Sequence, residues 1–588
     1  MTTDQNYQQI YRVGGMLDAG FVGQITYTIS LDQVYDELDI HFSFDKRLYS
    51  ESDVTPELID KLQTLCTAKY DAPTYPVEKF RQTILHEMKT EIHTMAELND
   101  NFIGCIHRQL TDRHMLYTKE FTSDGCLAQD TFSGVLKVTV LVFNVLLDNT
   151  QYTLTVSGHP VGQGVIAPNF NLMDTVKTAA GNAGASNAAG SADNSCEAES
   201  APASAVATAG SSGVSGAGSA ATAGDSSTTG SSSAGNTVTA STRFKRLELH
   251  NHTVESDGSL TCQELTEYLA ADHVDAFAIT DHNTTSGQKK IEQLLEEKHY
   301  PISLIRGMEY TTYFGHILCL NLAKYVPWNS IDQHRPELLF EAAREKGALV
   351  GIAHPFSYGD PFARGCRFEM TVSDYSKGDF IEIFNNPEPL HEVNERGTNL
   401  WMSLIFSGYQ ITATSGMDLH NRAKLAGCYA TYIEGKNGGN IASELDTAIH
   451  THRTWVSKGA LLLTEVLPET NELLLTFTDA HKPGFAVPKT AQVVLKGKDK
   501  TFTTSVSLDK PVCVSLNQLS GTDPIIPLLY EAPGINGAAT VSNAAHVAAS
   551  TSCGSAADTS SAAGQLKEID ALPAIEGLLC VSPVLYRD

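Results

Sequence analysis

The chain has 588 residues, of which 42% are hydrophobic and 19% are charged, and its formal net charge is −27. The length suggests roughly three or four domains, and the composition is typical of a soluble globular protein and excludes a largely disordered chain. The acidic charge argues against a nucleic-acid partner and against docking on an anionic membrane, because both partners attract basic surfaces. The sequence shows no apolar window that could span a membrane, no signal-peptide pattern and no paired-cysteine motif, so we expect a cytoplasmic protein.

Residues 1–172 are predicted to form a β-rich accessory domain with a helical insertion. Apolar and polar residues alternate, as they do in strands, over four segments: 23–31, 38–44, 135–145 and 151–156. Between them, residues 56–110 have apolar residues three and four apart, which predicts helix. This stretch contains His86, Glu87 and His93, but the two histidines are seven residues apart and do not match the HExxH zinc motif. We therefore interpret them as part of a polar helix face.

Two low-complexity tracts interrupt the chain. Residues 173–241 are rich in Ala, Gly, Ser and Thr, and 178–240 contain no aromatic residue, so we expect a flexible linker there. A similar tract at about 534–565 lies inside a second β-rich domain, predicted for residues 461–588. We find nothing catalytic in that C-terminal domain.

The central region, residues 242–460, alternates short apolar strands with helical segments. The predicted strands are 247–252, 276–281, 302–305, 316–322, 349–354, 380–384 and 410–414. The predicted helices include 263–271, 287–298, 336–346 and 396–407. This alternation predicts an α/β fold with a largely parallel sheet. Seven strands suit either a barrel or a doubly wound sheet, and periodicity alone leaves both open.

Potential metal ligands gather where these strands end. They are His250 and His252, then Asp281 and His282, then Glu309, His354, and finally Asp418 and His420. Active sites of α/β barrels lie at the carboxyl ends of the strands, and mixed histidine and carboxylate ligands suit Zn, Mn or Fe. Each residue alone could be a core histidine or a loop cap, but their joint occurrence favours a metal centre. His316 opens its strand, and pattern alone does not include it.

Five segments in this region resemble, in order, the motifs of the PHP (polymerase and histidinol phosphatase) superfamily. They are LELHNHTVESDGSLT, AFAITDHNT, GMEYTTYFGHILCL, GIAHPF and SGMDLHN. The resemblance implies a distorted seven-stranded (β/α) barrel that holds two or three divalent ions. It also implies nine ligands: His250, His252, Asp257, His282, Glu309, His316, His354, Asp418 and His420. Of these, Asp257, His282 and His420 would surround the third ion.

The chain resembles most the stand-alone bacterial metallohydrolases of the CehA/McbA-like group. Trp401, in a helix before the last motif, and a terminal strand at 578–586 are typical of that group. Met417 departs from it, because a serine usually precedes the aspartate of this motif. The departure leaves the nine implied ligands intact.

The resemblance implies a metal-dependent hydrolase, most simply a phosphoesterase that uses a metal-bound hydroxide on a small phosphate ester. We expect Asp281 to orient a ligand imidazole. Arg364 or Arg367 could clamp a phosphate, but for each arginine taken singly the sequence favours a solvated surface residue. The same centre could hydrolyse a carboxylic ester, carbamate or amide. A non-catalytic metal-binding regulatory module is a further alternative, against which the complete ligand set argues.

Overall fold

The computed structural model describes residues 7–46, 48–70, 76–86, 88–108, 110–146, 149–161, 243–385, 392–482, 484–532 and 562–586. The chain divides into Pro168–Ala240 and one compact unit made of Met1–Ala167 and Ser241–Asp588. All that follows concerns the compact unit. The expected linker at 173–241 and most of the tract at 534–565 lie outside the described residues. The domain boundaries at 172, 241 and 460 stay predictions.

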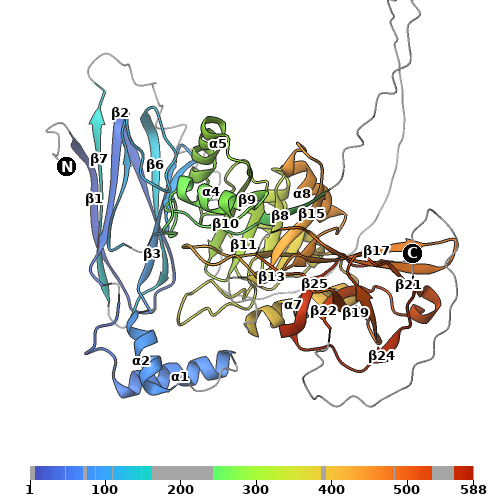
Figure 1. Ribbon diagram of the computed structural model, residues 1–588. Helices are drawn as coiled ribbons and strands as arrows, with labels where there is room; N and C mark the ends of the chain where they lie inside the picture. The colour runs from blue at the N-terminus through green and yellow to red at the C-terminus, as the bar shows by residue number, and fades with distance from the viewer. Residues whose placement is uncertain are drawn as a thin grey trace, which may run out of the picture. The chain divides into compact units, whose positions relative to one another are not determined.

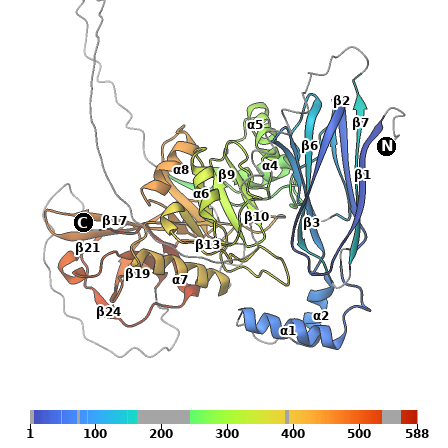
Figure 2. The same ribbon diagram turned by 180° about the vertical axis from the view of Figure 1, so that it is seen from behind.

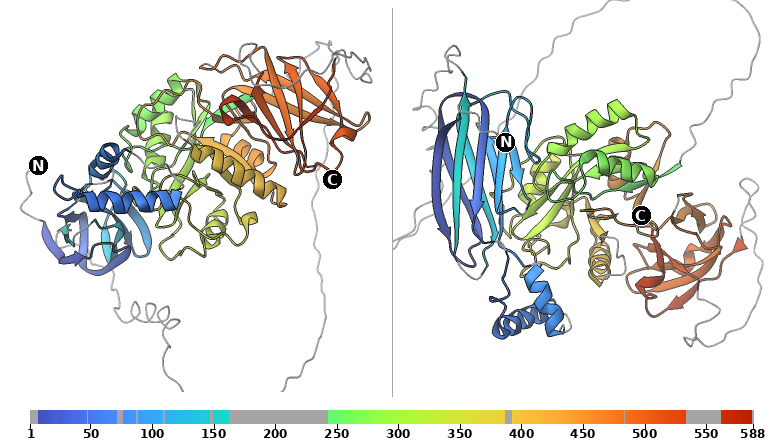
Figure 3. Two further views of the ribbon diagram at one scale, coloured as in Figure 1. Left: turned by 90° about the horizontal axis from the view of Figure 1, so that it is seen from below. Right: turned by 60° about the vertical axis from the view of Figure 1, so that its left-hand side comes forward.

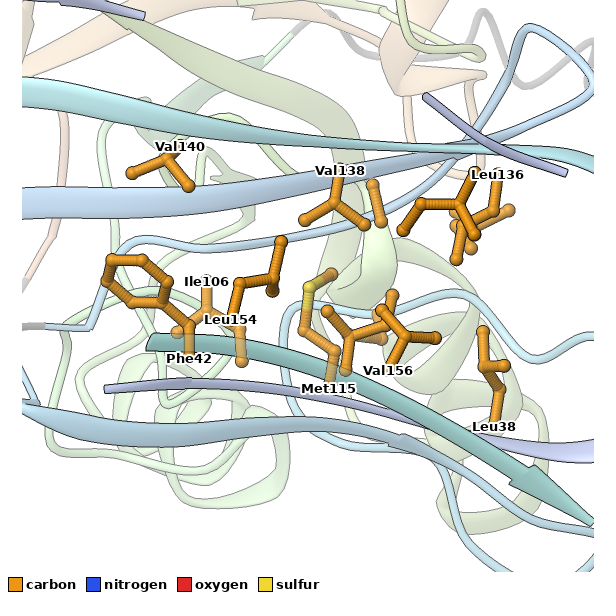
Figure 4. Close-up of a cluster of buried hydrophobic side chains, with 14 of the residues drawn as sticks. Leu38, Phe42, Ile106, Met115, Leu136, Val138, Val140, Leu154 and Val156 are labelled. Carbon is orange, nitrogen blue, oxygen red and sulfur yellow. The ribbon is translucent and has the colours of Figure 1, made fainter. Parts of the chain in front are cut away.

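A seven-stranded antiparallel sheet forms the N-terminal part (Figure 1). Its strands are β1 Gln8–Leu17, β2 Gly23–Phe44, β3 Glu91–Leu98, β4 Asn101–Ile106, β5 Asp112–Tyr117, β6 Phe132–Asn144 and β7 Thr150–Pro160. The segments 23–31 and 38–44 belong to the single strand β2, whose pairing with β6 shifts register between Leu31 and Tyr35. Apolar side chains of several strands meet in one buried core, among them Leu38, Phe42 and Val138 (Figure 4).

The helical prediction for 56–110 holds only in its first half. Helices α1 Pro56–Tyr70 and α2 Val77–His86 are followed by β3 and β4. Asn99 and Asp100, which join these two strands, both have positive φ angles (51° and 61°), as the tight turns of β-hairpins require. His93 therefore lies on a strand and is fully buried, so its assignment to a polar helix face is wrong.

The mixed α/β class of the central region is confirmed. Strands β8 Arg243–Glu248, β9 Ala276–Ile279 and β10 Ser303–Thr312 are parallel neighbours, and so are β12 Leu349–Ile352, β13 Phe380–Asn385 and β14 Thr412–Gly416. Between these groups, β11 Gly315–Leu320 runs antiparallel to both β10 and β12. The helices are α4 Cys262–Ala271, α5 Ser286–Lys298, α6 Glu337–Arg344, α7 Glu392–Phe406 and α8 Ile441–His450 (Figure 2).

The expected closed seven-stranded barrel is not observed among the described strands. β14 ends the sheet, and the second neighbour of β8 is β15 Ala430–Gly435, which runs antiparallel to it. The sheet then continues through β16 Trp455–Ser457, β25 Leu578–Val581, β22 Ile526–Glu531, β19 Thr490–Lys496, β20 Thr501–Ser507 and β24 Lys567–Ile569. A second sheet contains β17 Ala460–Leu467, β18 Glu472–Asp479, β21 Val512–Ser515 and β23 Ala562–Ala563 (Figure 3). One part of the β-rich C-terminal region thus extends the central sheet, and the other part forms the second sheet.

The N-terminal sheet packs against the hairpin of β10 and β11. Met95 and Phe143 share one buried cluster with Met308, Tyr310 and Ile317. Polar contacts accompany this packing: the Gly125 amide donates to Glu255 Oε2 at 3.0 Å, and the Thr284 hydroxyl donates to the Gly125 carbonyl at 2.9 Å. No described helix is long and apolar enough to cross a membrane.

Candidate metal centre

Two loops bring four of the predicted ligands side by side. His250 and His252 follow the end of β8, and Asp418 and His420 follow the end of β14. The loops pair like short parallel strands, because the His252 amide donates to the Leu419 carbonyl at 2.9 Å. The two histidines of the first loop are fully buried.

Glu309 lies at the centre of the site and is fully buried. Its Oε2 lies 3.1 Å from His250 Nε2, 3.3 Å from His252 Nε2 and 3.0 Å from His282 Nδ1. Its Oε1 lies 2.8 Å from His316 Nδ1 and 2.9 Å from His354 Nε2. The antiparallel direction of β11 explains His316, because the start of this strand lies beside the carboxyl ends of its neighbours.

The other two carboxylates each join several imidazoles. Asp418 Oδ1 lies 3.0 Å from His252 Nε2 and 3.4 Å from His250 Nε2. Asp257 Oδ1 lies 3.6 Å from His282 Nε2 and 3.4 Å from His420 Nε2. The structure therefore brings all nine predicted ligands into one connected cluster.

The donor atoms of this cluster fit divalent cations. Eight of the nine ligands form three groups, and the donor atoms of each group lie within 4.8 Å of one another; the ninth, His354, contacts Glu309. The groups are His250, His252, Glu309 and Asp418; His252, Asp257, His282 and His420; and His282, Glu309 and His316. Several of these atoms are buried and have no hydrogen-bond partner within the described chain, including His250 Nε2, Glu309 Oε2, Asp257 Oδ1 and Asp418 Oδ1. Unpaired buried polar atoms are costly, and cations between them would remove that cost.

Burial and nearby charges shift the pKa values of the cluster's imidazoles in different directions. Burial opposes charge on His250, but the attraction of Glu309 and Glu382 outweighs it and raises the pKa of this imidazole. Burial likewise opposes charge on His420, and Asp257 and Asp418 outweigh it, raising its pKa to about 10. His282 behaves oppositely, because burial and the neighbouring imidazoles of His107 and His252 lower its pKa.

Sequence reasoning missed Glu382, which supports the cluster from β13. Its Oε1 lies 3.0 Å from His250 Nδ1, and its Oε2 accepts a hydrogen bond from the His354 amide at 3.0 Å. This contact turns His250 Nε2 toward Glu309. The only sequence signal was a single acidic residue in the apolar strand FIEIFN.

Asp281 contacts the loop between His252 and Asp257. Its carboxylate accepts hydrogen bonds from the Thr253 amide at 2.7 Å and from the Ser256 hydroxyl at 2.6 Å. Burial raises the pKa of Asp281 to about 6. These contacts fix the backbone that carries Asp257.

The two candidate arginines lie in different surroundings. Arg364 lines a cavity beside the cluster and forms an ion pair with Asp360 at 3.2 Å. Arg367 is not among the residues that line this cavity. Its guanidinium lies over the rings of Tyr70 and Phe356, 5.3 Å from each ring centre.

The cavity has a volume of about 190 Å³ and is lined by parts of the chain that are far apart in sequence. His282, His354 and Asp418 line it together with Lys89, Glu91 and His107 of the N-terminal sheet region. Sequence reasoning did not single out the last three residues. Of the motif at 86–93, His86 is exposed, Glu87 lies outside the described residues, and His93 lies behind His107 with ring centres 3.9 Å apart.

Comparisons with known proteins cover parts of the chain. Residues 7–160 match a family of unknown function, DUF6669. A 5'-3' exoribonuclease of Haemophilus influenzae is 36% identical over 141 residues, which are 23% of this chain and 50% of that protein. An uncharacterised protein of Methanocaldococcus jannaschii is 30% identical over 112 residues, 19% of this chain and 58% of that protein. The chain thus spans about half the length of these curated relatives.

Two solved structures are similar at low identity. One is a two-domain protein from Bacteroides vulgatus containing a predicted PHP-like metal-dependent phosphoesterase, with 14% identity and a TM-score of 0.28 over 49% of this chain and 90% of that chain. The other is an amidohydrolase from Chromobacterium violaceum with bound sulfate and no metal. It has 16% identity and a TM-score of 0.23, and the match covers 30% of this chain and 87% of that chain.

Proposed function

We propose that this protein is a metal-dependent hydrolase of the PHP superfamily, within its CehA/McbA-like group, that acts on a small phosphate ester. One observation carries the proposal: six imidazoles and three carboxylates converge in one largely buried cluster, and several of their donor atoms have no hydrogen-bond partner among the described residues. Such a donor set suits two or three Zn, Mn or Fe ions. When bound, clustered divalent ions supply a hydroxide near neutral pH and neutralise charge that develops on phosphoryl oxygens.

The residues around the cluster have defined tasks in this proposal. Glu309 and Asp418 each face more than one imidazole and would hold neighbouring ions together. Asp281 fixes the loop that carries Asp257. Arg364 and Lys89 line the cavity and offer cationic donors to the non-reacting oxygens of a phosphate.

The size of the cavity supports a small substrate or the end of a larger one. Its volume of about 190 Å³ is below the range of about 300–1,000 Å³ that is usual for pockets that enclose drug-sized ligands. A phosphate group with a small part of its leaving group would fill it. The general acid that protonates the leaving group is not assigned.

The similarity to a 5'-3' exoribonuclease favours a second candidate, a phosphodiester at the end of a nucleic acid. This candidate departs from the expectation that the acidic chain has no nucleic-acid partner. Carboxylic esters, carbamates and amides remain alternative substrates of the same centre, and a regulatory metal-binding module remains the non-catalytic alternative.

The test combines metal analysis with a hydrolysis panel. The purified protein should contain more than one transition-metal ion per chain and hydrolyse phosphomonoesters faster than phosphodiesters, a 5'-phosphorylated RNA oligonucleotide or carboxylic esters. The double variant His250→Ala, His252→Ala should lose both the ions and the hydrolysis, because no neighbouring side chain replaces these two ligands. Absence of bound metal, with no hydrolysis after Mn²⁺ or Zn²⁺ is added, would falsify the proposal.

A further inference from the structure

His107 brings the N-terminal domain into the metal cluster. It directly follows β4, is 4% exposed and lines the same cavity as His282 and Asp418. Its ring stacks on that of His282 with centres 4.1 Å apart. A residue from the region that matches a family of unknown function therefore touches two of the predicted ligands, Asp257 and His282.

The two oxygens of Asp257 face different partners. Oδ2 lies 3.4 Å from His107 Nε2. Oδ1 faces His282 Nε2 and His420 Nε2, is buried, and has no hydrogen-bond partner among the described residues. An N–H group at His107 Nε2 would hold Oδ2 and leave Oδ1 directed toward the two imidazoles.

His107 is itself held from behind. Its ring centre lies 3.9 Å from that of His93, and His93 Nε2 lies 3.1 Å from Glu91 Oε1. All three side chains are buried. Glu91, His93, His107 and Asp257 therefore form a chain of contacts that joins the N-terminal sheet to the cluster, and each member restricts the position of the next.

We propose that the N-terminal domain is a working part of the metal centre, and that His107 is a positioning residue which holds Asp257 for the cation shared with His282 and His420. The inference rests on the proposed function only in that this position takes a cation. It assigns a role to residues 7–160 that goes beyond covering an apolar face of the central sheet.

Glu91, His93 and His107 could instead hold an ion of their own, because they offer donor atoms within 4.8 Å of one another. The geometry favours positioning for two reasons. Glu91 already pairs with His93, and the Nε2 atom of His107 faces Asp257. The positive charge of Arg113 also acts on His93 and opposes a further cation there.

The experiment measures Mn²⁺ binding to the full-length, metal-depleted protein by calorimetry and by elemental analysis after dialysis. His107→Ala should weaken one Mn²⁺ site by about 10–100-fold and leave the other sites unchanged, which is the usual effect of losing a group that orients a metal ligand. His107→Gln keeps a side-chain N–H donor and should restore most of the affinity. Tyr325→Phe is the matched control, because it removes only a hydroxyl that bonds Met95 across the same domain contact.

Combining the variants identifies the partner of His107. In an Asp257→Asn background, His107→Ala should have almost no further effect on Mn²⁺ affinity, because the two changes disable the same position. Melting temperatures of the metal-free variants, including His107→Gln, establish that each protein folds.

Two results would overturn the inference. The first is unchanged Mn²⁺ affinity in a folded His107→Ala protein. The second is an ion that is lost in Glu91→Gln and His107→Ala but retained in Asp257→Asn, which would assign a separate metal site to Glu91, His93 and His107. Neither result depends on turnover, so a protein that binds Mn²⁺ normally but hydrolyses no phosphate ester would contradict the proposed function alone.

Discussion

Glu382 contacts the cluster without facing the cavity, and its charge should matter more than its shape. Glu382→Gln keeps an acceptor for His250 Nδ1 but removes the negative charge that favours a basic Nε2. We expect metal affinity or turnover to fall by about 10–100-fold while the metal-free protein melts near the wild-type temperature. Calorimetric Mn²⁺ titration and steady-state kinetics measure both quantities.

Glu434→Gln is the control for this substitution, because Glu434 lies on the exposed side of β15 and pairs with Arg453. It should change neither affinity nor turnover. If Glu382→Gln behaves like Glu434→Gln, Glu382 is only a packing residue.

His420 should make the stability of the metal-free protein depend on pH. Its pKa is about 10 in the folded protein and about 6.5 when unfolded, so its protonated form stabilises the fold. This contribution is fully present below about pH 6.5 and is lost as the pH rises through about 10. The melting temperature of the metal-free protein should therefore fall by a few degrees between pH 7 and pH 10.

His420→Asn should make this decrease smaller, because asparagine does not titrate. Thermal melts of chelator-treated wild type and variant across this range provide the measurement. Parallel pH profiles for the two proteins would show that His420 is not held in its charged form.

Among single residues, the sequence alone was enough to predict the ligands that belong to local motifs. It was not enough to predict the residues that position those ligands. His250, His252, Asp418 and His420 stand in recognisable pairs, and the structure brings them together. Glu382 and His107 carry no local signal, because His250 lies 132 positions from Glu382 and Asp257 lies about 150 positions from His107 in the chain. Only tertiary packing creates their roles.

At the scale of the elements, two glycines have nearly the same φ angle but differ in how closely other atoms surround them. Comparing their alanine variants therefore separates the cost of backbone strain from the cost of a steric clash. Gly125 and Gly347 have φ angles of 80° and 81°, which disfavour any other residue. A Cβ atom on Gly347 would meet nothing within 4 Å, whereas one on Gly125 would lie 2.9 Å from the Glu255 carbonyl oxygen and closer still to that of Cys105. Gly125→Ala should therefore destabilise the protein by about 3 kcal/mol or more, and Gly347→Ala by about 1–2 kcal/mol.

Urea unfolding of both variants measures the difference. Gly125→Ala should also weaken Mn²⁺ binding, because Gly125 joins the N-terminal domain to the loop after His252. Equal losses of stability in the two variants would mean that the backbone at Gly125 and Glu255 moves apart to make room for the Cβ atom without a cost in stability.

The prediction of helices and strands succeeded where the spacing of apolar residues clearly matched only one of the two. Most central strands and helices lie close to their expected positions, because short apolar runs alternate there with clear helical patterns. The first strand, predicted for 247–252, instead ends at Glu248, so His250 and His252 lie in the loop after it. The prediction failed for 91–106. Ile92, Met95, Ala96 and Leu98 have helical spacing, but this segment forms a strand because it pairs with β6. The antiparallel β11 and the open end of the sheet at β14 also depend on long-range pairing, which a local pattern does not contain.

At the scale of the whole molecule, shortening residues 178–240 by half should leave turnover and melting temperature unchanged. The tract has no aromatic residue, and halving a loop changes its closure free energy by only about 0.6 kcal/mol. Activity assays and thermal melts of the shortened protein provide the measurement. A loss of soluble protein or of turnover would show that the tract has a structural or functional role of its own.

The metal cluster and its supports draw on residues from Glu91 to His420, and this spread has a consequence for folding. Contacts between distant parts of a chain form late, because the chain must first close long loops. No short fragment of this protein contains all nine predicted ligands, so partly folded intermediates should not hold the full set of ions. If the cluster binds the proposed ions, their full retention through gel filtration would report that the native topology is complete, so metal content would serve as a folding assay.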